Sequence, residues 1–284
     1  MAIDYPAILG RQFTPDVCAY SQRDTMLYAL SLGLGADPLD TRQLRFVYEP
    51  QLVTLPTLAC VVGHRSIKEL ALGIDYAKVV HGDQSLIVHR ALPPAGAIVS
   101  TTTVENVIDK GAGKGALLIL RRTLANQADG ELLAESRMGI LCRGDGGFGG
   151  PASDVPLAHA LPDRAADANF EQTTSAQAAL LYRLNGDLNP LHADPAVATR
   201  AGFERPILHG LATLGIAVRA VLATMCDYEA ARIAAIAGRF SSPVYPGDTL
   251  RTEMWRDDEV VSFRTWAVER GALVLNSGRV DLRS

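Results

Sequence analysis

Hydrophobic and polar residues alternate in two separate blocks of the chain, which is the pattern of half-buried β-strands. In the first block the alternation runs through residues 84–104, 115–123 and 132–142, and in the second through 239–255, 260–268 and 273–282. Each block opens with two nearby prolines, then a glycine turn and a run rich in β-branched residues. Two blocks of such similarity predict a duplicated small domain rather than a solenoid.

Three segments have the features of helices. Residues 24–33 begin at an acidic residue and end at a glycine, and residues 175–184 begin with Ser175, a good capping residue. Residues 210–225 are apolar on nearly every side, so this helix has to be buried all round. A strongly curved antiparallel sheet wrapped around such a helix would bury it. Two copies of this unit predict an α+β protein of two similar halves.

A stretch rich in glycine and proline separates the two blocks, at residues 143–153. Such a stretch is typical of a loop or linker. We therefore predict an N-terminal domain over residues 1–145, a linker over 146–167 and a C-terminal domain over 168–284. Alternatively, the glycines cradle a phosphate, although no helix follows them directly to add its dipole.

Composition constrains the partners and the compartment. The chain has 284 residues, 48% of them hydrophobic and 20% charged, and a net charge of −4, which gives no general attraction to nucleic acid or anionic membrane. No signal peptide and no apolar run long enough to span a membrane is visible, so we expect a cytoplasmic protein. The cysteines are far apart and form no CxxC pair, which predicts free thiols: Cys18, Cys60, Cys142 and Cys226.

Candidate chemistry is concentrated between residues 185 and 192. Gly186 permits a tight turn, and Pro190 fixes the backbone and prevents a regular helix from running through it. Asp187 and His192 can then converge on one water as an acid–base pair, and Asn189 can hold a water or a side chain. Alternatively, Asp187 caps the turn and His192 is a partly buried histidine without a chemical role.

A second element lies just downstream. Gly210 follows residues 206–209 and opens the apolar helix, where unpaired backbone N–H groups and the helix dipole favour negative charge. An enolate oxygen developing on a thioester carbonyl needs such a donor, which is typically worth about 3 kcal/mol of barrier. A metal site of Asp187, His192 and Asp194 is the less favoured alternative, because nothing supplies a clear second shell of ligands.

The segment from Tyr182 to His192, together with residues 206–211, resembles the hydratase 2 motif of the MaoC-like family, the R-specific enoyl-CoA hydratases. Residues 45–49, 77–82, 107–111, 146–150 and 239–247 resemble counterparts in the hydratase domain of the peroxisomal multifunctional β-oxidation enzyme. The resemblance covers nearly the whole chain. It implies a double hotdog fold, in which each half is a curved antiparallel sheet around a long apolar helix. Only the C-terminal half then keeps the catalytic turn, and the N-terminal half widens the acyl pocket.

The resemblance also implies roles for individual residues. Catalysis falls to Asp187 and His192, with Asn189 in support, Gly210 N–H on the thioester oxygen, and Glu49 needed for activity or for positioning. The CoA and acyl path runs along His81, Gly82, Lys110, Leu188, Pro190, Leu191 and Phe240. The residues alone instead favour His81 as a structural histidine, Lys110 as a solvated surface lysine and Phe240 as part of the core.

We therefore predict reversible syn hydration of trans-2-enoyl-CoA to (3R)-3-hydroxyacyl-CoA, without a metal or other cofactor, in fatty acid β-oxidation. CoA is part of the substrate, and the thioester itself acidifies C2. The resemblance further implies a homodimer. Two alternatives stay open: a non-catalytic protein of the same fold that binds acyl thioesters, and a 3-hydroxyacyl-thioester dehydratase that works in the reverse direction.

Overall fold

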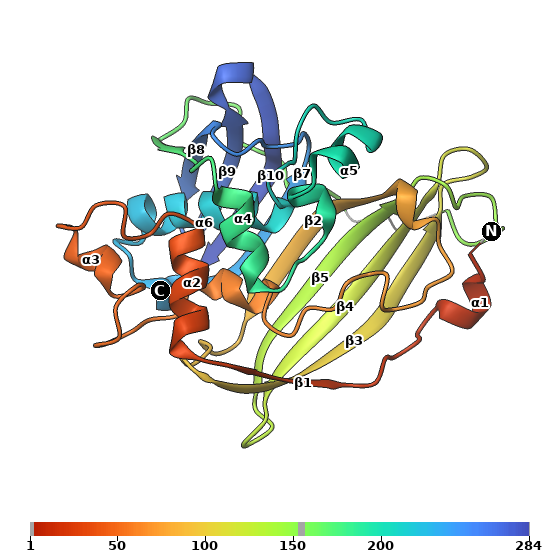
Figure 1. Ribbon diagram of the computed structural model, residues 1–284, viewed down its shortest axis with the longest axis horizontal. Helices are drawn as coiled ribbons and strands as arrows, with labels where there is room; N and C mark the ends of the chain where they lie inside the picture. Colours follow the sequence, from red (N-terminus) through yellow and green to blue (C-terminus); the bar gives the residue numbers. More distant parts are fainter. Residues whose placement is uncertain (1–2, 153–156, 284) are drawn as a thin grey trace.

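A single antiparallel sheet of ten strands dominates the computed structural model, which describes residues 3–152 and 157–283 (Figure 1). The spatial order of the strands is β1-β3-β4-β5-β2-β7-β10-β9-β8-β6. Their bounds are β1 Asp16–Tyr20, β2 Val79–Val88, β3 Gly96–Asp109, β4 Ala116–Asn126, β5 Leu132–Cys142, β6 Ala168–Thr173, β7 Ile233–Phe240, β8 Thr249–Asp257, β9 Val260–Ala267 and β10 Ala272–Leu282.

The strand order repeats itself in the two halves. The order β1-β3-β4-β5-β2 in the first half corresponds to β6-β8-β9-β10-β7 in the second, read inward from each edge of the sheet. The halves join where β2 pairs with β7, in a register that runs from Asp83 opposite Arg239 to Ile87 opposite Ala235. The predicted α+β double hotdog, built from two similar halves, is confirmed.

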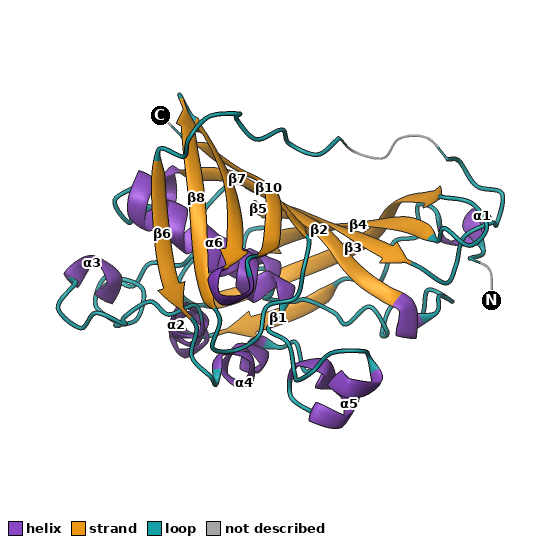
Figure 2. Cartoon of the chain, turned by 90° about the horizontal axis from the view of Figure 1, so that it is seen from above, coloured by secondary structure: helices purple, strands orange, loops and turns teal. Residues whose placement is uncertain are grey.

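The long apolar helix of the second half is α6, Gly210–Met225. Twelve consecutive residues, Leu211 to Leu222, are buried, as the apolar pattern predicted. Helix α6 lies inside the curve of the sheet, and α2 (Gln22–Ser31) and α4 (Ala178–Tyr182) pack side by side next to it (Figures 1 and 2).

The other helical segments are short. They are α1 Tyr5–Ile8, α3 Thr41–Leu44, α5 Pro195–Arg200, η1 Pro56–Cys60, η2 Tyr76–Lys78, η3 Arg183–Asn185, η4 Pro190–His192, η5 Ala230–Arg232 and η6 Val268–Arg270. None of the helices in the described part of the chain has the length and apolar character needed to cross a bilayer.

The first half differs from the prediction, because none of its described residues form a long buried helix. At the corresponding place against β2, β5 and α6 lies η1, all five residues of which are buried. The carbonyl groups of Ala59 and Val62 accept hydrogen bonds from the guanidinium of Arg122, at 2.5 and 2.7 Å. Arg122 is 6% exposed on β4, so the sheet itself anchors the segment that replaces the helix.

The glycine-rich stretch after β5 is folded against the end of β3. The carboxylate of Asp109 accepts hydrogen bonds from the N–H groups of Gly111, Gly147 and Gly149, at 2.7–2.8 Å. These N–H groups are therefore occupied, which argues against the alternative that they cradle a phosphate. No helix or strand is found in the described residues between Cys142 and Ala168. The domain boundaries at 145 and 168 stay a prediction.

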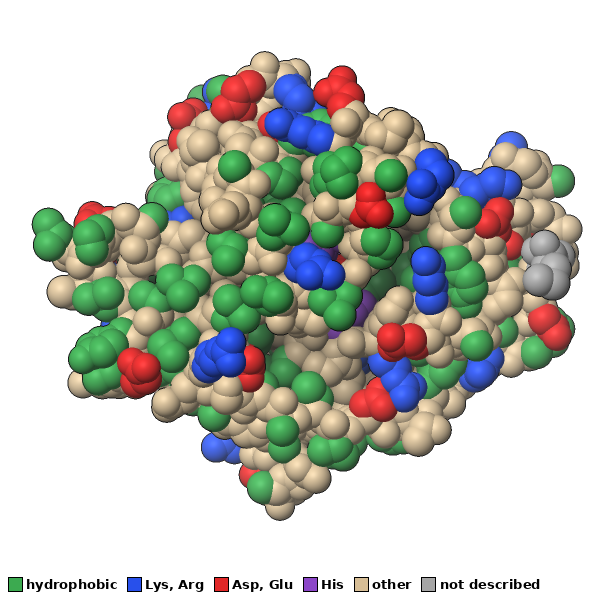
Figure 3. Space-filling view, viewed as in Figure 1, with side chains coloured by type: hydrophobic (Ala, Val, Ile, Leu, Met, Phe, Trp, Pro, Cys, Tyr) green, Lys and Arg blue, Asp and Glu red, His purple; other side chains and the backbone are tan. Residues whose placement is uncertain are grey.

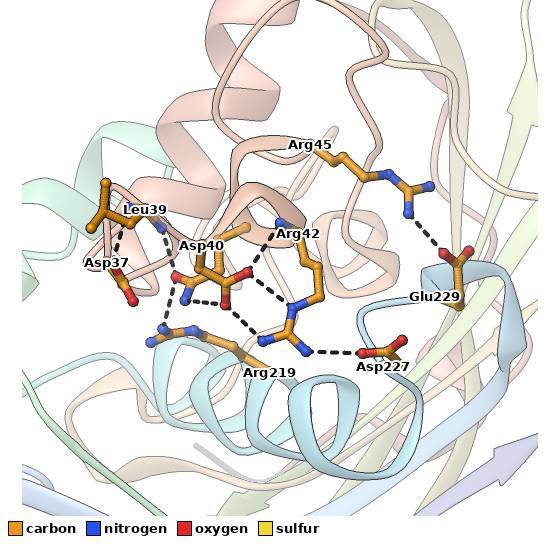
Figure 4. A network of polar contacts seen from close by, with 10 residues as sticks. Asp37, Leu39, Asp40, Arg42, Arg45, Arg219, Asp227 and Glu229 are labelled. Atoms are coloured by element: carbon orange, nitrogen blue, oxygen red, sulfur yellow. Dashed lines mark hydrogen bonds and ion pairs between the residues drawn. The ribbon is translucent and has the colours of Figure 1, made fainter.

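The segment that follows α2 is tied to the far end of α6 (Figure 4). Arg42 pairs with Asp40 and with Asp227, both at 3.0 Å, and Arg45 pairs with Glu229 at 2.7 Å. The pairs of Arg42 with Asp227 and of Arg45 with Glu229 join the two halves at the end of α6 opposite Gly210.

Candidate active site

The turn between α4 and α5 carries the predicted acid–base pair. Gly186 ends η3 with φ 116°, in the left-handed region, which confirms the need for glycine there. Pro190 opens η4, which places His192 at the end of a single tight turn. The side chain of Asn185 donates to Ser31 Oγ at 3.2 Å and thereby ties the turn to α2.

Asp187 and Asn189 shape this turn through the backbone. Oδ1 of Asp187 accepts from Asn189 N–H at 3.2 Å, and Oδ1 of Asn189 accepts from Leu191 N–H at 3.1 Å. Asn189 therefore supports the turn, whereas its predicted contact with a water or substrate stays a proposal. Asp187 is half-buried, and none of the described residues hydrogen-bonds its second carboxylate oxygen. That oxygen is left for a water or a substrate.

His192 has a defined tautomer. It is 8% exposed, and its Nδ1 lies 2.8 Å from the carbonyl oxygen of Ile207. A carbonyl can only accept a hydrogen bond, so Nδ1 carries the proton and Nε2 keeps a free lone pair. Burial lowers the pKa of His192 below its ordinary value. The neutral ring can accept a proton at Nε2 near neutral pH.

His209 completes the cluster around Asp187. Ligand-type atoms of Asp187, His192 and His209 all lie within 4.8 Å of one another. The rings of His192 and His209 stack, with centroids 3.7 Å apart and planes at 24°. Nε2 of His209 donates to the backbone carbonyl of Asp187 at 3.2 Å. Burial, together with the neighbouring His192, lowers the pKa of His209 to about 3, so this ring is neutral.

The stacking of His192 on His209 argues against the alternative that this cluster is a metal site. Two histidines bind one ion well when the in-plane lone pairs of their nitrogens converge on it. In nearly parallel stacked planes the lone pairs run side by side, so one ring would have to turn out of the stack. Asp194 is not in the cluster, because its carboxylate caps α5 by accepting from Ala196 N–H at 2.8 Å. The arrangement therefore suits acid–base chemistry better than chelation.

Gly210 directly follows His209 and begins α6. As the first residue of the helix it has no intrahelical acceptor, and none of the described residues accepts from its N–H. A Cβ on Gly210 would lie 3.3 Å from the ring of Phe240. Phe240 in turn meets the ring of His81 edge-on, with centroids 4.7 Å apart. The structure thus brings His81, Phe240 and Gly210 together beside the acid–base pair.

The first half contributes two histidines. Burial lowers the pKa of His81 to about 4, and burial together with Arg122 lowers that of His64 to about 4. The charge of Asp187 opposes both shifts, so both rings lie within its electrostatic reach. Asp187 therefore acts electrostatically on four of the six histidines of the chain, and burial lowers the pKa of each of them.

An open hollow lies on the first half beside His64. It has a volume of about 390 Å³ and is lined by Asp16, Val17, Gly63, His64, Arg65 and Glu69. Figure 3 shows histidine side chains within a recess near the middle of one face of the molecule. The recess gives solvent and ligand access to at least one imidazole of the protein.

The other residues that the resemblance assigned to the substrate path lie in the turn of Asp187 and His192, on β2 and after β3. Leu188 is 60% exposed, Pro190 is exposed and Leu191 is half-buried, all in the catalytic turn itself. Gly82 follows His81 on β2, where a Cβ would meet the carbonyl oxygen of Gly139 at 3.4 Å. Lys110 is exposed after the end of β3 and is not part of the cluster.

Glu49 is exposed on the loop after α3. Its neighbours Arg45 and Phe46 contact Glu229 and Tyr228, which follow the C-terminal end of α6 (Figure 4). Asp187 lies at the N-terminal end of the same helix, and the 16 residues of α6 span about 24 Å. The contacts of its neighbours thus lie at the end of α6 away from Gly210, and the role of Glu49 in activity or positioning stays a prediction.

The sequence interpretation missed two residues of the site. His209 directly precedes Gly210, and its position between a predicted turn and a predicted helix start was the available signal. His64 gave no signal, because its position depends on distant contacts, such as the hydrogen bonds that Arg122 donates to the segment before it.

Both halves of the chain match known protein families. Residues 18–144 match the family model described as the MFE-2 hydratase 2 N-terminal domain, and residues 158–277 match the MaoC like domain. The chain is 40% identical over 261 residues to 3-hydroxyacyl-thioester dehydratase Y of Mycobacterium tuberculosis, covering 91% of the chain and 89% of that protein. It is 38% identical to the probable enoyl-CoA hydratase 2 of Dictyostelium discoideum, covering 98% and 96% respectively.

Other relatives are much longer. The chain is 38% identical to the peroxisomal multifunctional enzyme type 2 of Mus musculus, but 96% of it spans only 38% of that protein. Among solved structures, the MaoC-like dehydratase from Phytophthora capsici superimposes with a TM-score of 0.88 at 30% identity, covering 99% of this chain and 98% of that one.

Proposed function

The chain belongs to the MaoC-like hydratase 2 family, and we propose that it catalyses the reversible syn hydration of trans-2-enoyl-CoA to (3R)-3-hydroxyacyl-CoA. It is an enzyme of the hydro-lyase class, as its relatives are named hydratases and dehydratases. One observation carries the mechanism: ligand-type atoms of Asp187, His192 and His209 lie within 4.8 Å of one another, and His209 directly precedes Gly210, whose N–H has no acceptor among the described residues.

The proposed reaction adds one water across the C2–C3 double bond. A water held by Asp187 and His192 gives a proton to the pair while its oxygen attacks C3. The electron pair of the double bond moves toward the thioester carbonyl, whose oxygen becomes enolate-like and accepts a hydrogen bond from Gly210 N–H. The pair then returns a proton to C2 on the same face, which restores both residues.

The substrate path is proposed from the surroundings of Gly210. His81 and Phe240 flank the position of the thioester, and Leu188, Pro190 and Leu191 flank the acyl or pantetheine chain from the turn. Lys110 supplies a cation for the CoA phosphates, and Gly82 leaves room beside His81. Acyl-CoA is the proposed partner of the site, and no metal or other cofactor takes part in the scheme.

The oligomeric state and the location in the cell are proposals as well. We propose a homodimer, supported by the family and by exposed leucines on the neighbouring α2 and α4, Leu30 at 51% and Leu180 at 51%. Sedimentation at micromolar concentration tests it, and a monomer would contradict it. We also propose a cytoplasmic location, although the mouse relative is named peroxisomal. Fractionation of the cells that express the protein tests this.

A panel of trans-2-enoyl-CoA esters of increasing chain length, with chiral analysis of the product, tests the activity. We expect turnover of at least one ester and a 3R product. The dehydratase direction is the second candidate, because one relative is named a 3-hydroxyacyl-thioester dehydratase. It is measured by the same enzyme with (3R)-3-hydroxyacyl-CoA as substrate. A protein that binds the esters but turns over neither substrate would support the non-catalytic alternative.

A further inference from the structure

His209 is the most completely buried member of the site, with 1% of its surface exposed. One face of its ring stacks on His192, at a centroid distance of 3.7 Å, and Tyr182 packs against it at 4.9 Å. The three rings form a contiguous aromatic stack under the catalytic turn. Stacked and tilted aromatic pairs of this kind restrict the orientation of their members. The orientation of the His192 ring therefore depends on His209 as well as on Ile207.

His209 also contacts the other parts of the site. Its Nε2–H donates to the backbone carbonyl of Asp187 at 3.2 Å. In the chain it is the residue directly before Gly210, and Thr213 N–H of the first turn of α6 donates to its carbonyl at 3.1 Å. One side chain thus links the turn that carries Asp187, the ring of His192 and the start of the helix that carries Gly210.

The protonation state of His209 suits a residue that positions its neighbours and does not transfer a proton. Nε2 of His209 carries its proton, because the partner is a carbonyl oxygen. Nδ1 is buried and has no partner among the described residues. A second positive charge on a ring stacked against His192 would repel the imidazolium that forms when His192 accepts a proton. The buried neutral ring avoids this repulsion and offers an aromatic face.

We propose that His209 is a positioning residue of this reaction, which holds His192 and the Asp187 turn in register with Gly210 and takes up no proton itself. The proposal rests on the proposed hydratase function. Misplacement of reacting groups by about 1 Å costs on the order of a hundredfold in rate, so such a role is measurable in kcat.

Three substitutions separate the two contacts of His209. His209→Phe keeps an aromatic face but loses the N–H, His209→Gln keeps an amide donor but loses the ring, and His209→Leu loses both. We expect kcat on crotonyl-CoA to fall about fivefold in the Phe variant, the loss of one hydrogen bond, and about fiftyfold or more in the Leu variant. The Gln variant should lie between them. KM should stay within about twofold of wild type, because no binding contact is removed.

A matched control removes a histidine outside the site. His159 hydrogen-bonds Ser262 Oγ at 2.7 Å and is partly buried. We expect His159→Phe to keep kcat within about twofold of wild type. A purely structural role of His209 would lower the melting temperature of the variants and leave kcat per folded molecule unchanged, which would overturn the proposal.

The pH profile of kcat/KM and the tautomer of His192 are two further measurements that test the positioning role. The acid limb of kcat/KM should keep its position in His209→Phe, since a residue that takes up no proton cannot set that limb; a shifted or missing limb would overturn the proposal. NMR of protein labelled with 15N-histidine reports tautomers without turnover. We expect the Nδ1–H tautomer of His192 in wild type and in His209→Phe, and a tautomer mixture in His209→Leu.

The remaining outcomes distinguish the role of His209 from the proposed hydratase mechanism. A single unchanged tautomer of His192 in the Leu variant would contradict the proposal even if the chain had no hydratase activity. If His209→Leu does not fold, the Phe and Gln variants carry the comparison. Full activity of Asp187→Asn and His192→Gln would refute the proposed mechanism, whereas loss of activity in these two variants with a fully active His209→Leu would refute only the role of His209.

Discussion

Nδ1 of His192 lies 2.8 Å from the carbonyl oxygen of Ile207, and this contact leaves Nε2 as the basic atom of the ring. Burial lowers the pKa of His192, so the ring stays neutral to a lower pH than an exposed histidine, whose pKa is about 6.5. The proposed reaction needs the neutral ring. We therefore expect kcat/KM to be flat from pH 8 to about 6.5 and to fall only below that value.

The pH profile of kcat/KM on crotonyl-CoA, measured with a stability control at each pH, checks this expectation. An acid limb with its midpoint above pH 7 would mean that His192 is easier to protonate than its burial allows, and would contradict the assignment.

Gly210 and Phe240 are in close contact, and this contact predicts a partial rescue. A Cβ at residue 210 would lie 3.3 Å from the Phe240 ring, so Gly210→Ala must push the helix start or the ring by a few tenths of an ångström. Displacing the N–H donor weakens its bond to the developing oxyanion, and we expect kcat to fall about tenfold. Adding Phe240→Leu should recover part of the loss. If Gly210→Ala alone keeps full kcat, the N–H of Gly210 is not the donor.

Asp109 organises the glycine-rich stretch through three backbone N–H groups. These bonds, those of Gly147 and Gly111 first, lower the pKa of its carboxyl. Its contribution to stability is thus present at neutral pH and is lost as pH falls through the lowered pKa. At pH 7 we expect Asp109→Ala to lower Tm by roughly several degrees, with little change for the exposed Asp163→Ala. The difference between Asp109→Ala and wild type should shrink toward pH 3. A constant difference would contradict the electrostatic account.

Lys110 tests how a chain of net charge −4 holds anionic CoA. The side chain is exposed, and such a charge contributes about 0.2–1 kcal/mol to an ion pair. We expect Lys110→Ala to raise KM for a CoA ester a few-fold at low salt and to leave kcat unchanged, with the effect shrinking as salt is added. A short thioester without the nucleotide should not respond. An unchanged KM at low ionic strength would show that CoA is held elsewhere.

Periodicity predicted the elements that are strongly amphipathic or uniformly apolar. Helix α6 and β5 have the predicted bounds, and strands β4, β8, β9 and β10 differ from the prediction by a few residues at their ends. Strand β7 was largely missed, because the predicted run began at residue 239 and the strand is Ile233–Phe240. The edge strands β1 and β6 were missed, because they are five and six residues long and half-exposed. A helix predicted over residues 175–184 is shorter in the structure, since the chain tightens into η3 before Gly186.

The site was predictable where its chemistry is local in sequence. Asp187 and His192 belong to one turn, and Gly210 marks a helix start, so their residue types and spacing carried the information. His64 and His81 reach the site through the pairing of distant strands and the bonds of Arg122, which no local pattern encodes. The missing helix of the first half was hidden for a similar reason: residues 56–60 are buried because the sheet and α6 cover them.

Turnover by the wild type and by two near-isosteric variants tests the central claim most directly. Asp187→Asn and His192→Gln keep the volume of the turn and remove the acid–base groups. We expect wild type to convert crotonyl-CoA to (3R)-3-hydroxybutyryl-CoA, and each variant to be folded by circular dichroism with kcat at least about a hundredfold lower. A folded variant of either kind that hydrates crotonyl-CoA at the wild-type rate would contradict the proposal that this pair carries the reaction.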